Sequence, residues 1–158
     1  MDVRHAILVA VTGAVTLTSA AAAGPEGAKQ RVAITSQAAK TTTVSPAVLT
    51  PLQAGTLKRD SGTVAGAIPD ERVVMRDGQR VSIYEGVSTF KGKRGTLVTR
   101  YRDEYVDGGN GYHVGTGTWK VVRGTGQYAR ITGGGRSGNV WLDRGPWSSR
   151  NEGFLILR

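Results

Sequence analysis

The stretch "GTGTWKVVRGTGQYARITGGGRSG", residues 115–138, carries a strand-like run into a glycine-rich turn. Within it, Gly124, Gly126 and Ala129 have the G-x-G-x-x-G/A spacing of a dinucleotide-binding loop. That function requires a helix that begins at the second glycine, because the pyrophosphate binds at the helix N-terminus. Only the six residues 127–132 separate Gly126 from the next glycines at 133–135, so no such helix fits. The stretch is interpreted instead as a strand that ends in a sharp turn.

The first 23 residues have the pattern of a secretory signal peptide. A short basic start precedes the apolar run 6–23, and Ala21 and Ala23 satisfy the A-x-A rule, which predicts cleavage after Ala23 and a secreted, extracellular protein. A retained membrane anchor is the alternative, but the threonines, serine and glycine make this run too short and too polar for one. The chain contains no cysteine, so its stability has to come from a packed core and not from disulfides.

Composition divides the rest of the chain into two parts. Residues 24–51 are rich in Ala, Thr, Ser and Pro without hydrophobic periodicity, which predicts a disordered tether. From 52 to 158, short runs of β-branched and aromatic residues alternate with Gly, Asp and Asn every eight to twelve residues, which predicts one antiparallel all-β domain. The expected strands are 54–59, 62–68, 72–76, 79–84, 86–91, 95–106, 111–123, 137–143 and 153–158.

Turn chemistry and side-chain alternation refine this prediction. The segments "RDGQ" (76–79) and "KGKR" (91–94) indicate hairpins, and "DGGNG" (107–111) indicates a longer loop with several positive φ angles. Along 95–106, Leu97 and Tyr101 share one face while Arg100 and Arg102 share the other, so one face is dry and one is wet. Two packed sheets or a closed barrel would satisfy the pattern, and the glycine-rich bends with no intervening helix favour closure.

A family resemblance adds to this pattern. Residues 121–133, "VVRGTGQYARITG", resemble a segment of the allene oxide cyclase-like barrel superfamily, which includes the plant dirigent proteins; Arg123 and Ile131 depart from the usual glycine and alanine. The upstream "TFKGKRGTLVTRY" (89–101) is similar to a hairpin of bacterial members, and the resemblance covers roughly 52–158. It implies an antiparallel eight-stranded barrel, often trimeric, with an apolar cavity and no cofactor, in a secreted bacterial protein of unassigned activity. Tyr128 would fold back as a plug.

Inward-facing apolar and aromatic residues of such a barrel would present a dry wall to a guest molecule. A small barrel can also simply be filled by its own side chains, and this alternative stays open. The candidate cavity residues are Leu97, Tyr101, Trp119, Val121, Tyr128 and Trp141.

The sequence assigns no catalytic residue. His113 is the one histidine beyond residue 23, and without a nucleophile elbow or a cysteine it predicts neither a triad nor a zinc site. It is expected on the polar side of a hairpin. Glu85 and Arg102 are the nearest acid–base candidates.

Acidic residues at 103, 104 and 107, with Asn110, crowd one segment, but their spacing matches neither an EF-hand nor a calcium-binding repeat, so no metal site is expected.

The net charge of +9 and the pI of about 10.4 point to anionic partners. The cations are spread over turns and wet faces, which favours attraction to anionic cell-envelope polymers and not a specific nucleic-acid partner. Three functions remain: a barrel that binds a small apolar or aromatic ligand without a cofactor, a cofactor-free cyclase, isomerase or dirigent-like steering protein, and a basic polyanion-binding module.

Overall fold

A computed structural model describes residues 27–39, 43–143 and 145–158, and the predicted signal peptide lies outside these residues. The described residues form eight strands and one short 3-10 helix. These are β1 Lys29–Ala38, β2 Val44–Pro51, β3 Asp60–Arg76, β4 Gln79–Gly92, β5 Gly95–Asp107, β6 Tyr112–Gly124, η1 Gly126–Tyr128, β7 Ile131–Leu142 and β8 Trp147–Leu157.

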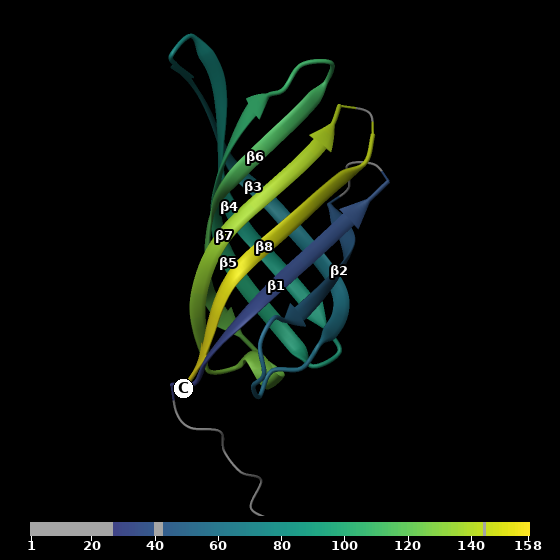
Figure 1. The fold of residues 1–158 in the computed structure, drawn as a ribbon, viewed down its shortest axis with the longest axis vertical. Coiled ribbons are helices and arrows are strands. Elements are labelled where there is room, and N and C mark those ends of the chain that lie inside the picture. The colour runs from purple at the N-terminus through teal and green to yellow at the C-terminus, as the bar shows by residue number, and fades with distance from the viewer. Residues whose placement is uncertain (1–26, 40–42, 144) are drawn as a thin grey trace, which may run out of the picture.

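The strands form one closed antiparallel barrel (Figure 1). Each strand pairs with the next in sequence, and β1 pairs with β8 from Lys29 opposite Ile156 to Ala38 opposite Trp147, which closes the sheet. The predicted all-β, eight-stranded antiparallel barrel is therefore confirmed. No helix among the described residues is long and apolar enough to cross a membrane.

The prediction of a disordered tether over 24–51 is wrong for the described part of that segment, which supplies β1 and β2. On β1 the side chains of Val32 and Ile34 alternate with Arg31 and Thr35, and both apolar side chains are buried. The small alanines, serines and threonines around them conceal this alternation. Residues 24–26 and 40–42 lie outside the described part.

The predicted strand 54–59 is also wrong, because residues 52–59 form the loop between β2 and β3. Gln30 on β1 holds this loop: its Nε2 donates to the carbonyl of Leu57 at 3.2 Å, and its Oε1 accepts from the Leu57 amide at 2.8 Å. Two pairs of predicted strands merge. The pair 62–68 and 72–76 becomes β3, with a bulge between Ala67 and Asp70, and the pair 79–84 and 86–91 becomes β4.

The predicted turns are confirmed. Asp77 and Gly78 have φ angles of 52° and 77°, which makes the β3–β4 connection a primed hairpin turn. Gly109, Asn110 and Gly111 have φ angles of 84°, 54° and 72° in the β5–β6 loop. The β3–β4 hairpin, drawn in teal, rises beyond the rest of the barrel at the upper end of Figure 1.

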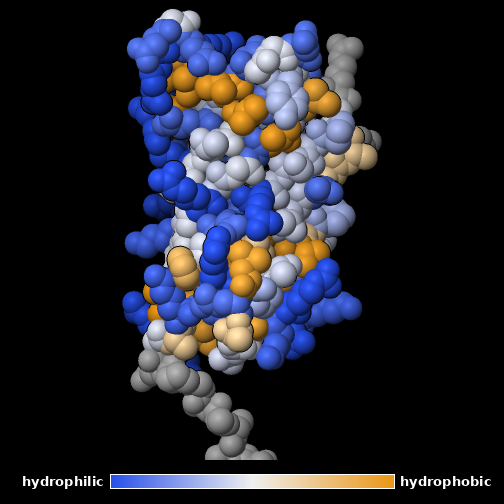
Figure 2. All heavy atoms as spheres, in the orientation of Figure 1, coloured by the Kyte–Doolittle hydropathy of each residue, from blue (hydrophilic) through white to orange (hydrophobic). Residues whose placement is uncertain are grey.

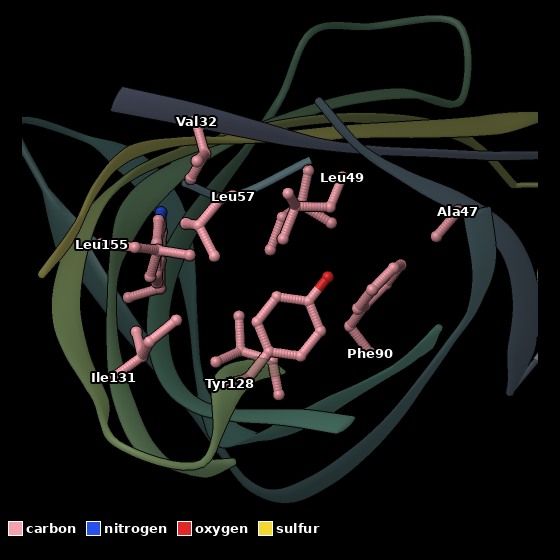
Figure 3. Close-up of a cluster of buried hydrophobic side chains, with 11 residues drawn as sticks. Val32, Ala47, Leu49, Leu57, Phe90, Tyr128, Ile131 and Leu155 are labelled. Carbon is pink, nitrogen blue, oxygen red and sulfur yellow. The ribbon is translucent and has the colours of Figure 1, made fainter. Parts of the chain in front are cut away.

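The other end of the barrel, next to the C-terminus in Figure 1, is filled by an apolar core. Figure 3 shows the ring of Tyr128 pointing into the middle of this core from η1, among Leu49, Leu57 and Phe90. Tyr128 is fully buried, which matches the plug predicted from the glycine-rich turn. Gly124 permits this arrangement, because a Cβ there would overlap the backbone of Tyr128.

One buried carboxylate ties this closed end together. Asp60, at the start of β3, is 3% exposed and accepts hydrogen bonds from the amides of Lys93 and Arg94 at 3.0 and 3.1 Å. It also accepts a bond from the Tyr128 hydroxyl at 3.0 Å. The β4–β5 turn and the plug therefore share one anchor on a third element of the chain.

Candidate ligand-binding cavity

The half of the barrel away from Tyr128 contains a cavity of about 330 Å³. Trp119 belongs to the apolar core and also lines the cavity, so it lies between the filled half and the hollow half. The cavity reaches the end of the barrel at which β2 and β8 begin, because its lining includes Thr43 and Trp147 there. The two alternatives left by the sequence, a filled barrel and a hollow one, each describe one half of the molecule.

Aromatic side chains dominate the lining. They are Tyr84, Tyr101, Tyr105, Trp119, Trp141 and Trp147. The ring of Tyr105 contacts Tyr84 and Trp141 edge to face, with centroids 5.3 and 6.5 Å apart. His113 stacks on Trp141 at 4.0 Å. These contacts brace the rings against each other, which holds the wall in a defined shape.

Asp103 is the one acidic side chain among the described residues that line the cavity. It follows Leu97, Thr99 and Tyr101 on the inward face of β5 and is 6% exposed. From β7, Ser137 Oγ donates to its Oδ1, and Asn139 Nδ2 donates to its Oδ2 at 3.0 Å. Burial raises the pKa of the Asp103 carboxyl above its ordinary value, while these two hydrogen bonds act in the opposite direction.

Glycines on β6 make room for this wall. Gly115 and Gly117 face Tyr105 and Asp103 across the β5–β6 pairing. A Cβ at Gly115 would overlap the Tyr105 ring, and a Cβ at Gly117 would overlap the Asp103 carboxylate. The first G-x-G of the stretch quoted at the outset thus lets two cavity side chains lie flat against the neighbouring strand.

Two buried polar atoms of the lining have no hydrogen-bond partner among the described residues: Ser45 Oγ and Trp147 Nε1. They lie on β2 and β8, on either side of β1, whose Ala38 pairs with Trp147. Burying a polar group without a partner costs about 1–3 kcal/mol, so such atoms call for an explanation. A ligand with a polar group at this wall would supply the missing partner.

The structure divides the six predicted cavity residues into two groups. Tyr101, Trp119 and Trp141 line the cavity as expected. Leu97 and Tyr128 are instead fully buried in the core of the closed end, and Val121 packs against that core. Side-chain alternation correctly placed Leu97 and Val121 on the inner face of the barrel, but alternation does not show how far along the barrel axis a side chain lies.

The acid–base candidates from the sequence lie outside the cavity. Glu85 and Arg102 form an ion pair of 3.0 Å on the outer face, with about half of each side chain exposed. His113 is not simply on the polar side of a hairpin, since it stacks on a cavity tryptophan and its Nε2 lies 2.8 Å from Asp143 Oδ1.

The acidic side chains of the segment 103–107 do not gather at one site. Asp103 points inward, whereas its neighbour Glu104 pairs with Arg76 and Arg102 on the outer face. Among the described residues, no three His, Cys, Asp or Glu side chains gather in a way that could hold a metal ion.

Cations lie on the outer surface. Among the described residues that line the cavity there is no lysine or arginine, whereas Arg100, Arg102 and Lys120 border a shallow groove on the outside of β5 and β6. Figure 2 shows one face of the molecule that is mostly hydrophilic across the middle of the barrel. Binding of anionic polymers, which stays a prediction, therefore concerns this outer surface and not the cavity.

Several cavity residues had no counterpart among the residues expected from the sequence, including Tyr84, Tyr105, Ser45 and Asp103. For Asp103 a pattern was available, because it continues the inward series at 97, 99 and 101. Asp103 was instead grouped with the neighbouring acidic residues as part of a loop, so the series was not extended to it. For Ser45 no local pattern was available, because its position depends on a strand that was not predicted.

The raised pKa of Asp103 gives a testable pH dependence of stability. A carboxyl whose pKa is higher in the folded state contributes stability below its ordinary pKa, and this contribution is lost as the pH rises through the folded-state value. The free energy of unfolding of Asp103→Asn, minus that of the wild type, should therefore increase from acidic to neutral pH. Chemical denaturation at a series of pH values measures this difference, in which the other carboxyls cancel. A difference that does not change with pH would contradict the expectation.

No family model, curated protein or solved structure matches this chain.

Proposed function

We propose that this chain is a small-molecule-binding barrel that holds an apolar or aromatic ligand in the cavity without a cofactor. The observation that carries the proposal is a hollow of about 330 Å³ whose wall holds six large aromatic side chains and two buried polar atoms with no hydrogen-bond partner in the described part of the chain. Ligand sites typically combine an apolar lining with a few placed polar groups, and volumes from about 300 Å³ are typical of them. The resemblance to the allene oxide cyclase-like superfamily supports the same proposal.

The test is an obstructing substitution on β8. Ser149 lines the cavity, whereas its neighbour Ser148 lies on the opposite face of the strand. Ser149→Trp should fill the cavity and abolish binding of phenolic compounds and fatty acids, while Ser148→Trp, the matched control, should leave binding intact. Calorimetry and tryptophan fluorescence can both follow binding, since all three tryptophans of the chain line the cavity.

Either of two results would refute the proposal. If the wild type binds no member of the panel, or if Ser149→Trp binds as tightly as the wild type while remaining folded by circular dichroism, the cavity is not the binding site and the proposal fails.

A second candidate, a cofactor-free isomerase or cyclase, is favoured by Asp103. A buried carboxyl with a raised pKa, held by two hydrogen bonds inside a cavity, is a group that can keep and transfer a proton. Detection by mass spectrometry and chromatography of an isomerised product from a bound compound, absent with Asp103→Asn, would support this candidate. Unchanged ligand after prolonged incubation with the wild type would count against it.

A further inference from the structure

The cavity of this barrel has an electrostatic character opposite to that of the whole chain. The chain carries a net charge of +9. The cavity lining contains the carboxyl of Asp103 and, among the described residues, neither lysine nor arginine. The charge of a bound ligand is therefore selected by Asp103 and the aromatic rings and not by the basic surface.

We propose that the ligand of this cavity is an organic cation, an aromatic amine or ammonium compound, whose positive group lies against Asp103 among the aromatic rings. This inference rests on the proposed small-molecule function and names the class of ligand.

An anionic ligand is disfavoured at this site. A carboxylate placed in the cavity would be removed from water without a cationic partner and would lie near the charge of Asp103. A cationic group is favoured at this site, because it would be attracted to the Asp103 carboxylate. Asp103 accepts one hydrogen bond on each oxygen, and a carboxylate can accept about four. Asp103 can thus accept from an ammonium group without giving up Ser137 or Asn139.

The aromatic wall favours the same charge. Tyr101 and Tyr105 flank Asp103 on the inward face of β5, and Tyr84 on β4 contacts Tyr105 edge to face. Aromatic faces attract cations through the ring quadrupole, and most strongly where water is excluded. A carboxylate surrounded by several aromatic rings is a common arrangement for recognising ammonium groups.

The wall opposite Asp103 defines the other end of the ligand. In an eight-stranded closed barrel, β5 lies across the lumen from β1. Ser45 Oγ and Trp147 Nε1, which have no partner among the residues that the structure describes, flank β1. Trp147 Nε1 can only donate, whereas the Ser45 hydroxyl can donate or accept. The fitting ligand therefore carries its cation at one end and an oxygen that can accept a hydrogen bond, such as a hydroxyl, at the other.

Three compounds that share a phenol ring test the charge preference directly. They are tyramine, which is cationic, 4-propylphenol, which is its neutral counterpart of similar shape, and 3-(4-hydroxyphenyl)propionate, which is anionic. Isothermal titration calorimetry on the full mature protein should give the tightest binding for tyramine and the weakest for the propionate. Because a hydrogen bond to a charged group contributes about 1.5–3 kcal/mol, tyramine should bind about ten- to a hundredfold more tightly than 4-propylphenol.

Substitution of the carboxylate separates its role from that of the cavity. Asp103→Asn should remove most of the preference for tyramine over 4-propylphenol. Glu85→Gln is the matched control, since it removes the same charge from the outer face of the neighbouring strand and should leave both affinities unchanged.

Lowering the pH gives an independent measurement on the wild type, which needs no variant to fold. Protonation of Asp103 should weaken tyramine binding and not 4-propylphenol binding. The groups facing Asp103 are Tyr84 on β4, Tyr101 and Tyr105 on β5, Gly117 on β6, and Ser137 and Asn139 on β7, and none of these gains or loses a proton between neutral and acidic pH. Glu71, bonded to the Tyr84 hydroxyl, and His113, stacked on Trp141, lie one side chain further away, and Asp103→Asn, which keeps both, separates their effect from that of Asp103.

Salt distinguishes the cavity from adventitious binding of the cation to surface carboxylates. The attraction of tyramine to surface carboxylates weakens as salt is added. Salt screens a contact with the buried Asp103 only a little, and it reduces the repulsion between tyramine and the basic outer surface. Tyramine affinity should therefore hold or increase with salt. Equal or tighter binding of the neutral or anionic compound overturns the inference while the proposed function stands. An absence of binding for all three compounds and for the wider panel overturns both.

Discussion

Asp60→Ala is expected to lower the free energy of unfolding by about 4 kcal/mol, because one substitution leaves a buried hydroxyl and two partly buried amides without an acceptor. The amides of Lys93 and Arg94 and the hydroxyl of Tyr128 all donate to this carboxylate, which is 3% exposed. The donors belong to the β4–β5 turn and to the plug, so the loss would loosen the closed end of the barrel from two sides. Chemical denaturation followed by circular dichroism measures it.

Graded substitutions test whether the network is the cause. Tyr128→Phe removes one hydrogen bond and should cost about 1 kcal/mol. Asp60→Asn keeps one acceptor oxygen and should fall between the two. Asp143→Ala, which removes a carboxylate that is 60% exposed and contacts His113, is the surface control and should cost less than about 1 kcal/mol. If Asp60→Ala lost no more stability than Tyr128→Phe, the shared anchor would not be the main support of this end.

The parts of the fold that were predictable are those encoded over a few residues. The Asp77–Gly78 turn, the glycine-rich loop 107–111 and the alternation along β5 each follow from local backbone or side-chain preferences. The plug was predictable from the spacing of Gly124, Gly126 and Tyr128, since only glycine leaves room for the tyrosine to fold back. In each of these features the backbone conformation depends on residues close in sequence, whereas the partners of the Tyr128 ring, such as Leu49 and Asp60, are distant in sequence.

The parts that were not predictable depend on closure of the barrel. β1 is held on one side by β8, at the opposite end of the chain, and its composition of small polar residues does not distinguish it from a tether. Once β1 and β2 are missed, their side chains, Ser45 among them, cannot be placed in the wall. The position of a side chain along the barrel axis could not be predicted from the sequence either. Leu97 and Asp103 share one face of β5, yet Leu97 lies in the filled core and Asp103 in the cavity.

Gly117→Ala is expected to cost about 3 kcal/mol of stability, whereas the same change at Gly138 should be neutral or stabilising by up to about 1 kcal/mol. A Cβ at Gly117 would overlap the carbonyl of Arg102, a backbone atom that cannot move unless β5 and β6 separate. Around a Cβ at Gly138, on the neighbouring strand β7, there is open space within 4 Å. Neither glycine has a positive φ, so the contrast isolates the close approach of the strands.

The same substitution links the glycine pattern of β6 to the cavity. The Cβ at Gly117 would also overlap the carboxylate of Asp103, so any folded Gly117→Ala protein has to displace this side chain from Ser137 and Asn139. Tyramine and 4-propylphenol should then bind to Gly117→Ala with similar affinities, as in Asp103→Asn, whereas Gly138→Ala should keep the preference of the wild type. Denaturation and calorimetry on this pair of variants measure both effects. A Gly117→Ala protein as stable and as selective as Gly138→Ala would show that β6 is not packed against Asp103 in this way.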